Sequence, residues 1–140
     1  MFKKDYETRL RHWRDFREHL EKCSDPLGDV IDRYEEAPSV SIHTDPYDPN
    51  IWPNPWELIL ENQYCEFCKL LGMCYTLQLT ERFSESCFRI HIAVDKTLSD
   101  MFYLLQVDNQ YLGYLDRPVG KEELPKTLIS QQCYDLPINT

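Results

Sequence analysis

The segment that most constrains the fold is a helix-patterned stretch over residues 62–79. Its sequence, NQYCEFCKLLGMCYTLQL, repeats apolar side chains at intervals of one and three residues. These intervals place them on one helix face, so the pattern predicts a helix that begins near Tyr64 and packs on a core. The stripe consists of Phe67, Leu70, Leu71, Cys74 and Leu77. Cys65 and Cys68 fall on an adjacent face, and Cys65 lies in the first turn.

Two strand patterns follow this helix. In residues 87–95, CFRIHIAVD, apolar side chains alternate with a second set that includes His91. Residues 102–114, FYLLQVDNQYLGY, form a second strand pattern that carries Asp108. A hairpin turning near residue 98 or 99 would place His91 opposite Asp108 or one diagonal away. The sequence therefore predicts an α+β fold, in which the Cys-bearing helix packs on a small antiparallel sheet.

Residues 3–23 have the pattern of an amphipathic helix, with charged side chains on every face but one. Its narrow apolar stripe consists of Tyr6, Leu10, Trp13, Phe16 and Leu20. Two interpretations are open: the helix packs on its own domain, or it docks to another subunit. We assign residues 1–24 as a docking helix and its stripe as a partner-binding surface.

The middle of the chain differs in composition from the segments on either side. Residues 25–55 are assigned as a Pro-rich extended segment that begins with a possible short helix at 29–36, because five of the nine prolines lie between positions 38 and 55. His43 lies alone in this loop, where a solvated role is expected. A short helix is predicted at Pro55–Glu61 with Asn54 as its N-cap. The core domain then spans residues 56–116, and residues 117–140 form a C-terminal strap.

Composition and charge narrow the function classes. The 140 residues suffice for one domain, and a net charge of −9 argues against a general nucleic-acid binder. Residues 1–22 hold seven Lys/Arg against five Asp/Glu, which leaves eight against nineteen in the rest. This basic arm on an acidic body favours a protein partner. Six cysteines, with no secretory leader and no membrane-length apolar run, indicate free thiols in a reducing compartment.

Three residues in chain order suggest nucleophilic chemistry. Cys65 at a helix start is placed to be a thiolate, because the helix N-terminus stabilises negative charge. His91 would act as general base, and Asp108 would fix its tautomer. The backbone N–H of Cys65 is a candidate oxyanion donor. Candidates for a second donor are Gln63, Tyr64 and Trp56.

This arrangement resembles a known family. A helix-borne Cys, a strand-borne His and an Asp on the neighbouring strand follow the block WPNPWELILENQYCEF at residues 52–67. Together they resemble the transglutaminase-like branch of the papain-like superfamily, and most of all the small transglutaminase-like proteins of tailed bacteriophages. The resemblance covers residues 52–114. It implies that Cys65 is the nucleophile, His91 the base and Asp108 the orienting carboxylate.

The resemblance carries two functional expectations. The first is a structural subunit of a phage particle, in the neck, tail or baseplate. Such a protein would be made in the host cytoplasm, incorporated into a virion and bound to other protein subunits, with no cofactor, metal, nucleic acid or membrane contact. The alternative is an active cysteine acyl-transfer enzyme, acting as a protease, an amidase or a crosslinking transglutaminase.

Other interpretations of the same residues stay open. The Cys65-x-x-Cys68 motif also fits half of a zinc site or a thioredoxin-type redox pair. The cysteines would alternatively pack as small apolar residues. Asp95 takes the place of Asp108 if the hairpin has a different register.

Overall fold

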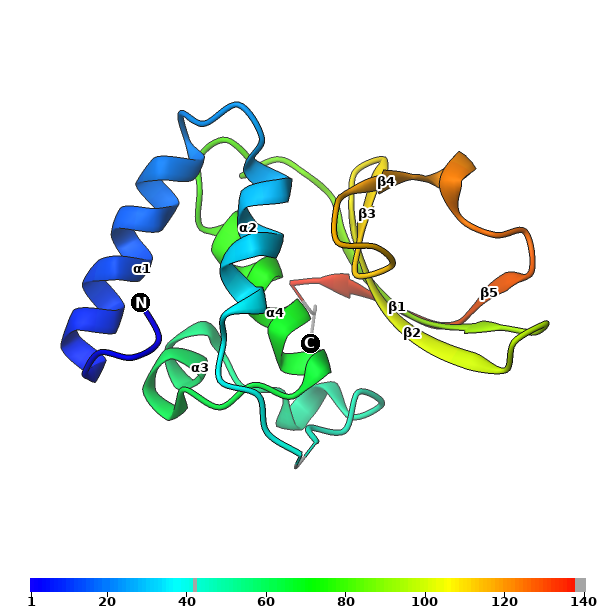
Figure 1. Cartoon of the computed structure of the whole chain (residues 1–140), viewed down its shortest axis with the longest axis horizontal. Helices are drawn as coiled ribbons and strands as arrows, with labels where there is room; N and C mark the ends of the chain where they lie inside the picture. The colour runs from blue at the N-terminus through cyan, green and yellow to red at the C-terminus, as the bar shows by residue number, and fades with distance from the viewer. Residues whose placement is uncertain (42, 138–140) are drawn as a thin grey trace. The chain divides into compact units, whose positions relative to one another are not determined.

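The computed structural model describes residues 1–41 and 43–137, and it divides the chain into two compact units. Unit 1 comprises Met1–Glu85 and contains the α-helices, whereas unit 2 comprises Ser86–Thr140 and contains the sheet (Figure 1). The division differs from the sequence-based one, because the boundary falls inside the predicted core at 56–116. The physical reason is that the helices bury their apolar faces against one another, while the strands pair with other strands of unit 2.

Unit 1 contains α1 (Tyr6–Leu20), α2 (Pro26–Glu35), the 3₁₀-helix η1 (Pro49–Ile51), α3 (Pro55–Glu61) and α4 (Glu66–Gln78). Helix α4 packs against α1, α2 and α3 (Figure 1). The predicted helix at Pro55–Glu61 is confirmed to the residue. Asn54 caps it, and a capping box pairs Asn54 with Glu57 because each side chain accepts the other's backbone N–H.

The apolar stripe of α1 packs within unit 1. Trp13, Phe16 and Leu20 are buried, with exposed fractions of 3%, 4% and 0%. Tyr6 and Leu10 are half-buried. The assignment of this stripe as a partner-binding surface is therefore wrong for its three buried members. The pattern itself could not decide the point, because a stripe of this width is satisfied equally by a partner or by another helix of the same unit.

A buried hydroxyl joins three of the helices. Thr76 on α4 is 0% exposed and donates to the Gly72 carbonyl at 2.7 Å. Its oxygen accepts the Trp13 indole N–H from α1 at 2.9 Å and lies 3.0 Å from the Tyr34 hydroxyl on α2. Burial raises the pKa of Tyr34 to about 12. Gly72 permits this close approach, since a Cβ there would lie 2.4 Å from the Tyr34 ring.

Unit 2 is a five-stranded antiparallel sheet with the order β4-β3-β2-β1-β5. Its strands are β1 (Phe88–Asp95), β2 (Asp100–Val107), β3 (Gln110–Leu112), β4 (Val119–Gly120) and β5 (Leu128–Leu136), with the 3₁₀-helix η2 (Lys121–Glu123) before β5. The two predicted strands correspond to β1 and to β2 with β3. In β1, Phe88, Ile90 and Ile92 are buried, as their alternation predicts.

The assignment of residues 117–140 as a surface strap is wrong for residues 128–136. These residues form β5, which pairs with β1 along its whole length, with one irregularity between Ile92 and Ala93. Most β5 side chains are exposed, so backbone hydrogen bonds hold the strand at the edge of the sheet. The sequence of β5 lacks the alternation of apolar and polar residues that predicts a strand, so the strand was not predicted.

The α+β class is confirmed. The Cys-bearing helix α4 belongs to unit 1, where its stripe faces the other helices. All five members of that predicted stripe are buried. Among the described residues, no helix is long and apolar enough to cross a membrane.

Candidate functional site

Cys65 is the N-cap of α4, one position before the first helical turn in which it was predicted. Its backbone is extended, with φ −75° and ψ 171°, and its sulfur accepts the Cys68 N–H at 3.4 Å. Cys65 thus takes the place that an Asp or Ser side chain usually occupies, where the unpaired N–H groups of a helix start favour an acceptor.

The two cysteines of the CxxC motif influence each other. The Cys68 side chain is the largest influence that lowers the pKa of Cys65, and backbone N–H groups add to it against the opposing effect of burial. The same interaction and burial raise the pKa of Cys68. The Thr44 hydroxyl lies 3.2 Å from the Cys68 sulfur. Cys65 is therefore the more acidic thiol of the pair.

A cavity of about 590 Å³, the Cys65 pocket, opens beside this pair. It is lined by Ser39, Val40, Ser41, His43, Thr44, Ile51, Pro53, Glu57, Leu58, Glu61, Gln63, Cys65 and Cys68. Every one of these residues belongs to unit 1. Cys65 and Cys68 are only 2% and 4% exposed, so both side chains present little surface to solvent.

A short backbone pairing brings the Pro-rich loop to the cysteines. Ser39 and Tyr64 form an isolated parallel bridge, in which Tyr64 N–H donates to the Pro38 carbonyl at 2.9 Å and Val40 N–H donates to the Tyr64 carbonyl at 3.1 Å. This bridge carries His43 and Thr44 to the pocket. His43 is exposed, as predicted, yet it lines the same pocket as Cys65. No local signal marks it, since the pairing joins segments 25 residues apart.

The three candidates for a second oxyanion donor lie in different surroundings. Gln63 lines the Cys65 pocket. Tyr64 is fully buried, and its hydroxyl donates to the Leu58 carbonyl at 3.4 Å. Trp56 is 52% exposed and packs edge-on against Trp13. Of the three, Gln63 alone has a side chain placed to meet a group bound in the pocket.

His91 lies on β1 in unit 2, where both of its ring nitrogens have partners. Nε2 lies 2.8 Å from the Gln106 Oε1, and Nδ1 lies 2.9 Å from the Ser130 hydroxyl. The Gln106 amide is oriented by its donation to the Asp108 carbonyl at 2.9 Å, so its oxygen faces the ring. Nε2 therefore carries the proton that Gln106 accepts. Sequence reasoning missed both Gln106 and Ser130.

The prediction that the Asp108 carboxylate orients His91 is wrong. The β1–β2 register pairs His91 with Leu104, which leaves Asp108 in the turn beyond the end of β2. Its φ is 52°, a left-handed conformation that Asp tolerates, and its carboxylate accepts the Cys87 N–H at 2.9 Å. The substitute Asp95 is also engaged elsewhere, because its carboxylate accepts from Thr97 N–H at 3.0 Å and the Thr127 hydroxyl at 2.9 Å.

A second cavity, of about 440 Å³, adjoins His91 within unit 2. Its lining is mostly apolar with two lysines: His91, Ala93, Leu104, Tyr111, Lys121, Leu124, Pro125, Lys126, Leu128 and Ser130. The predicted triad thus divides, with Cys65 in unit 1 and His91 and Asp108 in unit 2. The pairing of Cys65 with His91 stays a prediction.

Comparison of the chain with family models, with curated proteins and with solved structures gave no match.

Proposed function

We propose that this chain is a thiol-dependent protein whose reactive group is the Cys65 thiolate, and that its reaction is thiol–disulfide exchange with Cys68 as the second thiol. The observation that carries the proposal is the placement of Cys65 as the N-cap of α4, where its sulfur accepts the Cys68 N–H at 3.4 Å and Cys68 lines the same pocket. The interaction between the two side chains lowers the pKa of Cys65 and raises the pKa of Cys68. A dithiol needs this asymmetry, because the attacking sulfur must be ionised while the resolving thiol waits.

The exchange proceeds in two balanced steps. The Cys65 thiolate attacks one sulfur of a substrate disulfide, whose S–S bond breaks as a mixed disulfide with Cys65 forms and one thiolate leaves. Cys68 then loses its proton and attacks the Cys65 sulfur, which expels the second substrate thiol and closes the Cys65–Cys68 disulfide. The substrate gains two electrons, and the protein dithiol loses them.

The pocket limits the substrate. Both sulfurs are nearly inaccessible, so a disulfide must enter the cavity to reach Cys65. A volume of about 590 Å³ matches a small-molecule site. The pocket therefore favours a small disulfide, such as oxidised glutathione, over a disulfide inside another folded protein. The Thr44 hydroxyl, in contact with Cys68, is placed to relay the Cys68 proton to water or to the departing substrate thiolate.

The test exposes the reduced protein to oxidised glutathione and quenches it with an alkylating agent. We expect mass spectrometry to find a Cys65–Cys68 disulfide in the wild type and a stable glutathione adduct on Cys65 in Cys68→Ser. Cys65→Ser should form neither product. Cys74→Ser is the matched control, because Cys74 is a fully buried cysteine of the same helix outside the pocket. An adduct on Cys68 in preference to Cys65, or oxidation confined to the exposed Cys87 and Cys133, would refute the proposal.

A second candidate function is acyl transfer within a transglutaminase-like protein, the enzyme alternative that the sequence suggested. One observation favours it: Cys65 and His43 line the same pocket, so a nucleophile and an imidazole face one bound substrate. An activated thioester or ester probe distinguishes the two reactions. Acyl transfer predicts burst acylation of Cys65 that persists in Cys68→Ser and falls in His43→Gln, whereas exchange predicts a dependence on Cys68.

The role of a structural subunit in a tailed-phage particle also stays a proposal. It rests on the family resemblance, since the buried stripe of α1 no longer supplies a docking surface. Detection of the chain in purified particles by mass spectrometry is its direct test. Incorporation of Cys65→Ala at wild-type level, with wild-type infectivity, would assign Cys65 no part in that role.

A further inference from the structure

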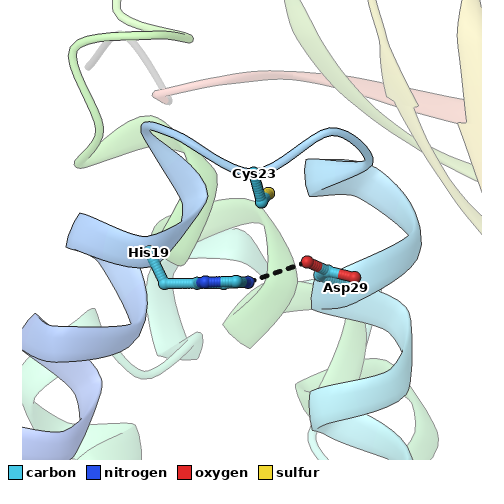
Figure 2. Close-up of side chains that lie close together, drawn as sticks. All are labelled: His19, Cys23 and Asp29. Atoms are coloured by element: carbon cyan, nitrogen blue, oxygen red, sulfur yellow. Dashed lines mark hydrogen bonds and ion pairs between the residues drawn. The ribbon is translucent and has the colours of Figure 1, made fainter.

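Unit 1 gathers another Cys, His and Asp where α1 connects to α2. His19 lies in the last turn of α1, Cys23 in the connection, and Asp29 in the first turn of α2 (Figure 2). One potential ligand atom from each side chain lies within 4.8 Å of the other two. The His19 Nε2 is 2.8 Å from the Asp29 Oδ2. This cluster shares no residue with the Cys65 pocket.

Local backbone structure explains why the three side chains converge. The Cys23 N–H donates to the His19 carbonyl at 3.0 Å, so the chain keeps a helical turn past the end of α1. Residues four apart on such a turn face the same side. Helix α2 then starts at Pro26, with the Asp25 carboxylate as its cap and the Asp29 N–H bound to the Asp25 carbonyl at 3.0 Å.

Contacts from the segment after α4 hold this connection in place. Arg82 donates to the carbonyls of Leu20 and Cys23 at 3.1 and 2.7 Å. The Glu21 carboxylate in turn accepts the backbone N–H groups of residues 81 and 82, each at 2.9 Å. The His19 ring stacks on Phe16, with ring centroids 6.1 Å apart and planes 18° apart. The cluster is therefore preorganised by groups that are not themselves ligands.

The donor set is that of zinc. Imidazole nitrogen, thiolate sulfur and carboxylate oxygen are the three side-chain ligand types of Zn²⁺ sites. Ligand atoms bound tetrahedrally at normal zinc distances are about 3.3–3.6 Å apart. The 2.8 Å contact and the 4.8 Å limit bracket that spacing, so the ligand atoms need to change their separations by about 1.3 Å at most to reach it. The Cys23 thiol donates to the Leu20 carbonyl at 3.8 Å, and a bound metal ion would replace the proton of that thiol.

We propose that His19, Cys23 and Asp29 bind one Zn²⁺ ion, with water or an exogenous ligand in the fourth position. A shallow hollow of about 660 Å³ borders His19 and Asp29 and provides room for that fourth ligand. Asp32, one helical turn beyond Asp29, lines the same hollow. An ion bound here links the end of α1 to the start of α2 and thereby stabilises unit 1. The proposal is independent of the reaction assigned to Cys65.

The test uses the full chain, reduced and freed of metal with a chelator, and titrates it with Co²⁺ as a spectroscopic substitute for Zn²⁺. We expect one equivalent to produce a thiolate-to-cobalt charge-transfer band together with the intense visible bands of tetrahedral cobalt. Added Zn²⁺ should abolish both. The midpoint of thermal unfolding, followed by tryptophan fluorescence, should rise when Zn²⁺ is present.

Variants identify the ligands. Cys23→Ser should abolish the charge-transfer band, and His19→Asn and Asp29→Asn should each weaken binding at least tenfold. The double variant Cys65→Ser, Cys68→Ser is the matched control, because it removes the other closely spaced thiols of unit 1 and should bind cobalt as the wild type does. Loss of the band in this double variant with retention in Cys23→Ser would overturn the proposal. A titration that yields no tetrahedral cobalt spectrum would do the same.

Discussion

Replacing Thr76 tests how the helices of unit 1 are held together. The Thr76 hydroxyl donates to the Gly72 carbonyl, so its two lone pairs are left for the Trp13 N–H and the Tyr34 O–H. Every hydrogen-bonding capacity of this buried group is used. A Val at this position keeps the shape of the side chain and leaves both donors without an acceptor.

The magnitude follows from those two donors. An orphaned buried donor costs about 1–3 kcal/mol, so we expect Thr76→Val, which orphans two donors, to lower the free energy of unfolding of unit 1 by about 2–6 kcal/mol. Thr76→Ser is the matched control, since it retains the hydroxyl and loses one methyl group at a cost of about 1 kcal/mol. For a unit of this size, each kcal/mol lost from the free energy of unfolding lowers the midpoint of thermal unfolding by about 4–8 °C.

Urea denaturation followed by tryptophan fluorescence measures the effect in unit 1 specifically. The three tryptophans of the chain, Trp13, Trp52 and Trp56, all belong to that unit. The expected order of stability is wild type, then Thr76→Ser, then Thr76→Val. If Thr76→Val is as stable as Thr76→Ser, the hydroxyl does not join the helices and the reasoning fails.

Three further predictions concern packing, backbone strain and pH. Gly72→Ala forces a Cβ to within 2.4 Å of the Tyr34 ring and should cost about 1–3 kcal/mol by the same urea assay; an unchanged midpoint would contradict the close α2–α4 approach. Ser99→Gly relieves an exposed residue at φ 58° and should raise the stability of unit 2 by about 0.5–1 kcal/mol, measured by circular dichroism on heating; a loss would show that the Ser99 side chain stabilises the turn. In the folded protein the pKa of Cys65 lies below the unfolded value of about 8.5, so its stabilising contribution should rise with pH up to about 8.5. The folded pKa of Cys68 lies above that value, so its contribution should be lost as the pH rises beyond about 8.5. The check is the urea midpoint of the wild type minus that of the double variant Cys65→Ser, Cys68→Ser, measured across pH. A difference that falls between pH 6 and 8 would reverse the roles assigned to the two cysteines.

Short-range rules made the helices and strands predictable. The helix at Pro55–Glu61 follows from a proline at its first position and the reciprocal Asn54–Glu57 cap, all within four residues. The stripe of α4 and the alternation of Ile90 and Ile92 follow from the helical and strand periods alone. The helix-start position of Cys65 was likewise predictable to within one residue, and the acceptor role of its sulfur toward the Cys68 N–H follows from that position.

What surrounds each reactive side chain depended on contacts between distant segments. A parallel bridge between Ser39 and Tyr64 brings His43 to the Cys65 pocket, and nothing near His43 encodes it. The partners of His91 were missed for a related reason, because they depend on strand register and on the edge strand β5, which has no apolar pattern.

The packing of α1 shows the same difference between local and long-range information. Its sequence determined which face is apolar, and only the tertiary structure decided that Trp13, Phe16 and Leu20 pack within unit 1. Apolar burial is non-directional, so an apolar stripe predicts that the helix packs against some apolar surface and does not predict which surface. Register and helix pairing are chosen by the sum of many long-range contacts, whereas caps and periods are local. The sequence by itself therefore determined the elements that have an apolar period or a local cap, and the thiol at the start of α4. The tertiary structure decided the neighbours of that thiol and added the edge strand β5.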